Sequence, residues 1–254
     1  MKTTVAVYQP ELFPPPHYFN RLLHSDVWVA LDDVQINRKA GHTSFRYVDD
    51  TGQERKYSIP ASGGNRAMLN EAMVHLTREE LNALLKTLSH VYRDAPYLSP
   101  LLDITERFFE VYMPPYQENP VAVSDMAIHW TVAMLQYLGW KGTFVKASET
   151  RTKDLPKHER MAVLTKMYGD VYVCGAEGFH NYLQLEEFEK RGLDVWVQNW
   201  TPPMEMVTML KGPNLSLFEV LAWHGEKTAD YCTLGGTDAW QKHEVKEMDV
   251  WDAY

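Results

Sequence analysis

The chain has 254 residues, of which 45% are apolar, so it is long enough to bury one sizeable core, and its formal net charge is −9. No apolar run approaches the roughly 20 residues that cross a bilayer, and strand-like sequence follows Met1 almost directly, so we expect a cytoplasmic protein without a signal peptide. The negative charge argues against a broad polyanion-binding surface but leaves room for a local phosphate site.

The first elements predict a strand–helix–strand unit. Residues 4–7 and 27–31 are short apolar runs rich in β-branched and aromatic side chains, which is typical of strands buried on both faces of a parallel sheet. Between them, residues 13–25 carry apolar side chains at helical spacing. In such units ligands bind beyond the carboxyl ends of the strands, so we look for a site there.

Polar side chains follow both strands at that edge of the predicted sheet. Gln9 follows the first strand, and Asp32 and Asp33 follow the second. Because successive side chains of a strand point to opposite faces, we expect at most one carboxylate to face a ligand and the other to organise the next loop. The ligand-facing carboxylate could bind an amino group, act as a general base or hold Mg²⁺. In the alternative interpretation, both carboxylates cap the loop by accepting backbone N–H bonds.

The segment after the second strand is rich in cationic and amide groups of the kind that bind phosphate or carboxylate. Its members are Asn37, Arg38, His42 and Arg46. His42 could titrate near neutrality and serve as an acid or a base. The alternatives are surface solvation for the arginines and a structural role for the histidine.

Helical patterns dominate the middle of the chain. Thr77 and Glu80 have the spacing of a capping box, Ser99 precedes a proline that opens another helix, and Ser124 is the predicted cap of a third. We therefore predict a helical insertion at residues 66–140.

Strand patterns on either side of this insertion complete the predicted fold. A hairpin is expected at residues 45–48 and 55–59 because a glycine-containing turn separates them. After the insertion, strands and helices alternate at residues 142–146, 158–168, 171–174, 183–191 and 193–198, and one more helix is expected at 218–223. The sequence thus predicts a single α/β domain over residues 1–254, with a mostly parallel sheet flanked by helices.

Two later segments add candidate residues. Lys157, His158 and Arg160 stand at the start of a predicted helix, where free backbone N–H groups favour an anion, although Glu159 could cap that helix instead. Gly175 follows a strand and would permit close approach of the backbone to a ligand. No GxGxxG, Walker, HxxxH or HExxH pattern is present, so neither a standard nucleotide loop nor a dedicated zinc site is predicted. We expect Cys174 to be packed and inert rather than nucleophilic.

Several of these motifs, taken in order, resemble the WbqC-like protein family. The Gln-Pro pair at residues 9–10, the segment 25–35 and the Asn/Arg-rich stretch after it carry the resemblance in the first third. Downstream it is carried by residues 157–160, 171–175, 178–182 and 215–221. The resemblance spans nearly the whole chain, to about Gly225, and it adds Gln35 and Tyr182 to the candidate substrate-binding residues.

The resemblance implies transfer chemistry. Similar proteins occur among O-antigen and other surface-polysaccharide biosynthesis genes, where attachment of an amino acid such as glycine to an amino sugar has been proposed. Related phage proteins look like amino acid:DNA transferases, which join an amino acid to pyrophosphorylated 5-hydroxymethyluracil during DNA hypermodification. We therefore expect a transferase whose partners are an amino acid and a phosphate-activated acceptor. DNA is the first candidate acceptor and an amino-sugar nucleotide the second, while a non-catalytic small-molecule-binding protein is the alternative from another class.

This hypothesis gives each candidate residue a role. Asp32 or Asp33 orients or deprotonates the amino group, and His42 is the third catalytic candidate. The remaining candidates bind substrate: Gln9, Gln35, Asn37, Arg38, Arg46, His158, Arg160, Gly175 and Tyr182. Mg²⁺ is the one cofactor that the carboxylates suggest.

Overall fold

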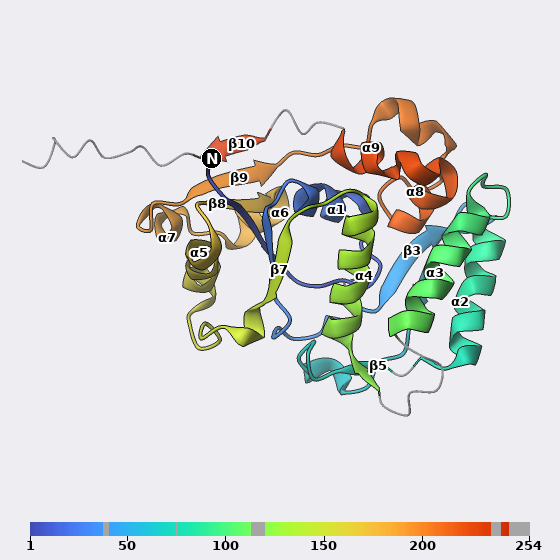
Figure 1. Ribbon diagram of the computed structural model, residues 1–254, viewed down its shortest axis with the longest axis horizontal. Coiled ribbons are helices and arrows are strands. Elements are labelled where there is room, and N and C mark those ends of the chain that lie inside the picture. The colour runs from blue at the N-terminus through green and yellow to red at the C-terminus, as the bar shows by residue number, and fades with distance from the viewer. Residues whose placement is uncertain (38–40, 75, 113–119, 235–239, 244–254) are drawn as a thin grey trace, which may run out of the picture.

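The computed structural model describes residues 1–37, 41–74, 76–112, 120–234 and 240–243, without the side chains of residues 65, 112, 182 and 241 (Figure 1). Its centre is a six-stranded sheet in the order β10-β9-β8-β1-β2-β7. The strands are β1 (Thr4–Tyr8), β2 (Val27–Ala30), β7 (Thr143–Lys146), β8 (Val171–Gly175), β9 (Asp194–Gln198) and β10 (Gln241–His243). All neighbouring pairs are parallel except β9 and β10. The predicted α/β fold with a mostly parallel sheet is confirmed.

Helices cover both faces of this sheet, because alternate side chains of each strand point to opposite sides. Ala6, Trp28 and Ala30 belong to a core that also contains buried side chains of α1 (Pro16–Leu23), α4 (Val123–Tyr137), α8 (Leu217–His224) and α9 (Thr228–Thr233). Val5 and Val29 belong to a second core, which includes α5 (Lys157–Tyr168), α6 (Ala176–Tyr182) and α7 (Leu185–Glu189). Figure 1 shows α5 and α7 on one side of the sheet and α4 on the other.

The segment between β2 and β7 contains the remaining larger elements. They are the hairpin β3 (Ser44–Val48) and β4 (Glu54–Ser58), the short pair β5 (Met73–Val74) and β6 (Val121–Ala122), and the helices α2 (Arg78–Val91) and α3 (Leu98–Tyr112). Short 3₁₀ helices lie at η1 (Gly64–Arg66), η2 (Ala147–Glu149), η3 (Met204–Met209) and η4 (Gly225–Lys227). The aromatic rings of Phe13, Phe45, Trp130 and Phe218 pack together and join the β3–β4 hairpin to α4 and α8. No helix in the described part of the chain is both long and apolar enough to cross a membrane.

The sequence signals predict the ends of most helices to within a few residues of their observed positions. The predicted cap at Ser124 is wrong. The Thr77 hydroxyl accepts from the Glu80 N–H and the Glu80 carboxylate accepts from the Thr77 N–H, as the capping box predicts. Ser124 is not a cap, because α4 already begins at Val123. The free N–H groups of Val123 and Ser124 instead donate to the Ala72 and Leu69 carbonyls.

Two other elements differ from the sequence predictions. The sequence pattern predicts no element at residues 176–182, which form α6, and α7 covers only part of the helix predicted at residues 183–191. No element is predicted at residues 241–243, yet they form β10, which pairs with β9 in an antiparallel edge.

Candidate functional site

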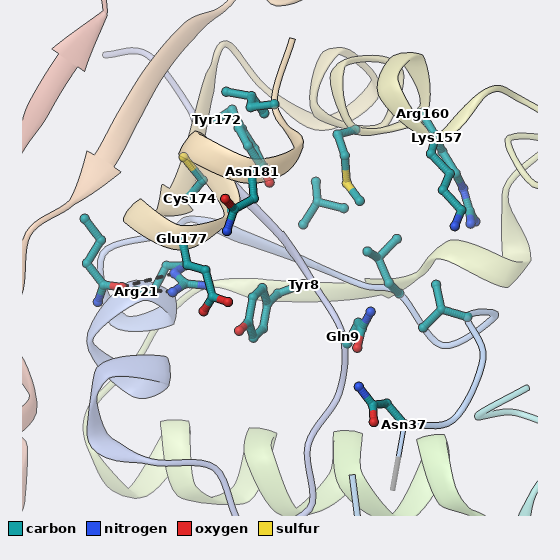
Figure 2. A pocket seen from close by; sticks show the side chains of 18 of the residues that line it. Tyr8, Gln9, Arg21, Asn37, Lys157, Arg160, Tyr172, Cys174, Glu177 and Asn181 are labelled. Carbon is teal, nitrogen blue, oxygen red and sulfur yellow. Dashed lines mark hydrogen bonds between the residues drawn. The ribbon is translucent and has the colours of Figure 1, made fainter. Parts of the chain in front are cut away.

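An open cleft of about 1690 Å³ lies beyond the carboxyl ends of β1, β8 and β9 (Figure 2). The two neighbours of β1 are reached through helices on opposite faces of the sheet, α1 before β2 and α5 before β8. This is a topological switch point, where open α/β sheets bind their ligands. Its walls come from the segments after the strands and from the first turns of α1, α5 and α6.

Asp33 lines the cleft, and its carboxylate is held by Arg160. Nη2 of Arg160 lies 2.8 Å from Oδ1 and 2.6 Å from Oδ2 of Asp33, and both side chains are buried. Nε of Arg160 donates to the Thr152 hydroxyl at 3.2 Å. Among the described residues Nη1 of Arg160 has no hydrogen-bond acceptor, so the guanidinium still has donors for a ligand.

Asp32 points elsewhere and organises the chain after β7. Its Oδ1 accepts the Ser148 N–H at 2.9 Å, and its other carboxylate oxygen accepts the Ser148 hydroxyl at 2.5 Å. It is 1% exposed and does not line the cleft. The two carboxylates thus separate onto different sides, as expected for successive residues after a strand.

His42 is buried behind the cleft and positions Gln9. Nδ1 of His42 accepts the Asn37 N–H at 3.0 Å, so the ring proton resides on Nε2, which donates to Oε1 of Gln9 at 2.9 Å. The Gln9 side-chain NH₂ group is thereby left to face the cleft as a donor. Burial lowers the pKa of His42 to about 4, so the ring is neutral near pH 7 and is a poor acid or base there.

Arg21 of α1 reaches the cleft from the opposite side of β1. Its Nε and Nη2 donate to Oε1 of Gln198 at 3.2 and 3.0 Å, and its guanidinium lies 4.4 Å from the centroid of the Tyr8 ring. It is 5% exposed and makes no ion pair with any acidic residue of the described chain. Gly175 leaves room for this guanidinium. A Cβ at position 175 would collide with Nη2 of Arg21.

The described lining residues carry more positive than negative charge. The cations are Arg21, Lys153, Lys157 and Arg160, and the acids are Asp33 and Glu177. Figure 2 shows Lys157 and Arg160 of the first turn of α5 at one end of the cleft, and Lys153 shortly precedes this helix in the chain. In a chain of net charge −9, this concentration of cations favours an anionic ligand.

The structure brings eight of the predicted site residues to one cleft: Gln9, Asp33, Gln35, Asn37, Lys157, His158, Arg160 and Gly175. It does not bring Arg46 there. Arg46 lies on the exposed face of the β3–β4 hairpin and pairs with Glu54 at 3.0 Å. Arg38 and the side chain of Tyr182 lie outside the described residues. Glu159 does not cap α5, whose N-cap is Pro156.

Sequence reasoning missed Arg21, Lys153 and Glu177 as site residues. One signal was present for Arg21, since it lies beside Tyr18 and Leu22 on the buried face of an otherwise apolar helix. A buried arginine needs a partner or a ligand. Its partner Gln198 is far away in the chain, so this cluster could not be recognised from local spacing.

Neither cysteine is suited to nucleophilic chemistry. Cys174 and Cys232 are both free and buried. Burial raises the pKa of the Cys174 thiol to about 12, although this residue lines the cleft. Among the described residues no cluster of three or more His, Cys, Asp or Glu side chains could hold a metal ion.

Comparisons with known proteins give one match. No curated protein and no solved structure matches the chain. The model of the WbqC-like protein family matches residues 9–231. This range includes all the described residues that line the cleft except Val7 and Tyr8 at the end of β1. Membership of this family is compatible with a transferase. The chain belongs to the WbqC-like protein family.

Proposed function

We propose that the chain is a transferase that couples an amino acid to a phosphate-activated acceptor. The observation that carries this proposal is the cationic end of the cleft, where Lys153, Lys157 and Arg160 surround the start of α5. The first backbone N–H groups of this 12-residue helix add a positive dipole end. A leaving diphosphate fits this combination, because negative charge grows on it as its bond to the acceptor breaks.

The first candidate acceptor is pyrophosphorylated 5-hydroxymethyluracil in DNA. The ammonium group of the amino acid would first give one proton to water, and the freed nitrogen lone pair would attack the methylene carbon on C5 of the base, forming a C–N bond. The C–O bond to the diphosphate would break, and pyrophosphate would leave with the bonding electrons. The extra proton on nitrogen would pass to water, and positioning with charge neutralisation would supply most of the rate.

The cleft residues take revised roles in this reaction. Arg160 and Lys157 hold the diphosphate, and Asp33 fixes the Arg160 fork in place. The Gln9 NH₂ group, oriented by His42, is a neutral donor to the substrates. In this proposal Asp33 and His42 are positioning residues.

An amino-sugar nucleotide is the second candidate acceptor. It also presents a diphosphate to the cationic end of the cleft. The net charge of −9 favours it, because DNA binding ordinarily relies on an extended basic surface.

A mass-spectrometric transfer assay tests the proposal. Pooled amino acids are offered with pyrophosphorylated 5-hydroxymethyluracil DNA and, separately, with amino-sugar nucleotides. An adduct on DNA with pyrophosphate release supports the first acceptor, and an adduct only on the sugar supports the second. No adduct on either contradicts the proposal and favours a non-catalytic binding protein.

Variants tie the activity to the cleft. Lys157→Gln removes an exposed lysine and should lower kcat at least tenfold, because it removes a cation from the leaving diphosphate. The matched control is Arg46→Gln, which removes an exposed cation from the β3–β4 hairpin and should leave turnover unchanged. Equal loss in both variants would point to a global charge effect rather than to the cleft.

A further inference from the structure

The end of the cleft opposite Lys157 and Arg160 is built around a second cation, Arg21. Figure 2 shows Arg21 and Glu177 toward one end, Lys157 and Arg160 toward the other, and Tyr8 and Gln9 between them. Arg21 is 5% exposed, and no acidic residue in the described ranges pairs with it. The Glu11 carboxyl feels the Arg21 charge but forms no ion pair with it. Burying a guanidinium that makes no ion pair is costly, so this arrangement favours an anionic ligand at that place.

Neighbouring residues hold the Arg21 guanidinium in a fixed orientation. Gln198 accepts two of its N–H groups through Oε1. The NH₂ group of Gln198 donates to the His17 carbonyl at 2.7 Å and to Oδ1 of Asn20 at 2.6 Å, which fixes the direction of the amide. Nη1 of Arg21 has no acceptor among the described residues. A planar fork held this way is prepared to bind a carboxylate.

Glu177 supplies the opposite charge at the same end. It is exposed, lines the cleft and makes no ion pair within the described chain. The charges of Arg21 and Glu177 both act on the imidazole ring of His17. Burial is the main cause that lowers the pKa of His17, while the Arg21 charge lowers it further and the Glu177 charge raises it.

One cation and one anion at the same end of a cleft match the two charges of an α-amino acid. We propose that Arg21 binds the carboxylate and Glu177 the ammonium group of the amino acid substrate. This inference rests on the proposed function and names the place of one of its two substrates. The α5 end of the cleft has an excess of cations and suits the diphosphate instead. An amino acid held between Tyr8 and Glu177 would face that end with its nitrogen.

Binding titrations with the full chain test this assignment. Each proteinogenic amino acid is titrated singly by calorimetry, with and without pyrophosphate, and the tightest binder is carried forward to the variants. Arg21→Lys and Glu177→Gln should each weaken it about tenfold or more, because each removes a charge-assisted contact. Lys157→Gln should weaken the binding of pyrophosphate and leave the dissociation constant of the amino acid unchanged.

A second ligand separates the two contacts. The carboxylic acid that lacks only the amino group of the best amino acid should lose affinity in Arg21→Lys but not in Glu177→Gln. Because Arg21 is buried, thermal unfolding of its variant is measured first. Should that variant fail to fold, the exposed Glu177 variant decides the outcome with the same two ligands.

The outcomes also separate this inference from the proposed function. Binding of an amino acid that both Arg21→Lys and Glu177→Gln leave unchanged would overturn the inference and leave the transferase proposal standing. Loss of amino acid binding in Lys157→Gln alone would show that the carboxylate binds at the α5 end of the cleft, and this result would also overturn the inference. Absence of any amino acid binding to the unaltered protein, with or without pyrophosphate, would overturn both.

Discussion

At the scale of single residues, the buried Asp33–Arg160 ion pair should affect both the free energy of unfolding and the transfer activity. Arg160→Met leaves the Asp33 carboxylate buried without a partner, which should lower the free energy of unfolding by about 3–5 kcal/mol. The double variant Asp33→Leu with Arg160→Met removes both charges and should recover most of that loss in denaturant titrations. It should still lack transfer activity, because the diphosphate contact is gone.

A matched control separates burial from charge in this experiment. Arg46 and Glu54 form an exposed pair on the β3–β4 hairpin, and Arg46→Met should cost no more than about 1 kcal/mol. A double variant at Asp33 and Arg160 that is unstable yet active would contradict the assigned roles.

Glu11 makes stability depend on pH in a specific window. Burial raises the pKa of its carboxyl from 4.5 to about 7, and the Arg21 charge opposes this rise only in part. The unfolded chain therefore loses this proton first as the pH rises, and the stability that Glu11 contributes below pH 4.5 is lost between about pH 4.5 and 7. Glu11→Gln should be more stable than the unaltered protein at pH 8, with the difference disappearing near pH 4.

The comparison isolates Glu11 from an opposite effect of His42. Because the folded pKa of His42 is lowered to about 4, its contribution to stability is lost on acidification from about pH 6.5 toward pH 4. Both proteins carry His42, so its contribution cancels in the difference between them. A difference in melting temperature that does not change with pH would contradict the assignment of the raised pKa to Glu11.

At the scale of elements, the end of β8 is shaped around Arg21. Gly175 has an ordinary φ of −86°, so alanine fits its backbone, but the added Cβ would displace the Arg21 fork. Gly175→Ala should weaken amino acid binding about tenfold and also lower the melting temperature, because displacing the buried Arg21 guanidinium strains its hydrogen bonds to Gln198.

Gly178 provides the control for that change. It lies in α6 and also lines the cleft, but a Cβ added there would meet no atom within 4 Å, so alanine adds a methyl group without displacing Arg21. Gly178→Ala should keep the affinity of the unaltered protein and raise its stability slightly, since alanine favours a helix. Equal affinity in the two glycine variants would show that Gly175 does not control the position of Arg21.

The elements that the sequence predicted well are those specified by local chemistry. The buried runs of β1, β2 and β8 read as strands because both faces are covered, and the capping box of α2 fixes its start within one turn. Ser124 was read as a cap because the sequence does not show that backbone carbonyls at Leu69 and Ala72 already serve α4. The edge strand β10 follows from pairing with β9 rather than from its own pattern.

At the scale of the whole molecule, the parallel topology explains which site residues could be found. Residues at or shortly after the end of a parallel strand, such as Gln9, Asp33 and Gly175, reach the same edge in any sheet of this kind, so the pattern alone places them. Arg46 was included because it is near in sequence, but the hairpin carries it away. Arg21 was missed because its setting depends on Gln198, which arrives from β9.

A crystal structure of the protein with pyrophosphate and its best amino acid would test the central claim most directly. The account predicts pyrophosphate against Lys157 and Arg160 and the amino acid against Arg21 and Glu177, in one cleft, with the amino nitrogen facing the pyrophosphate. Binding of either ligand outside this cleft, or of both at the α5 end with Arg21 unoccupied, would contradict it.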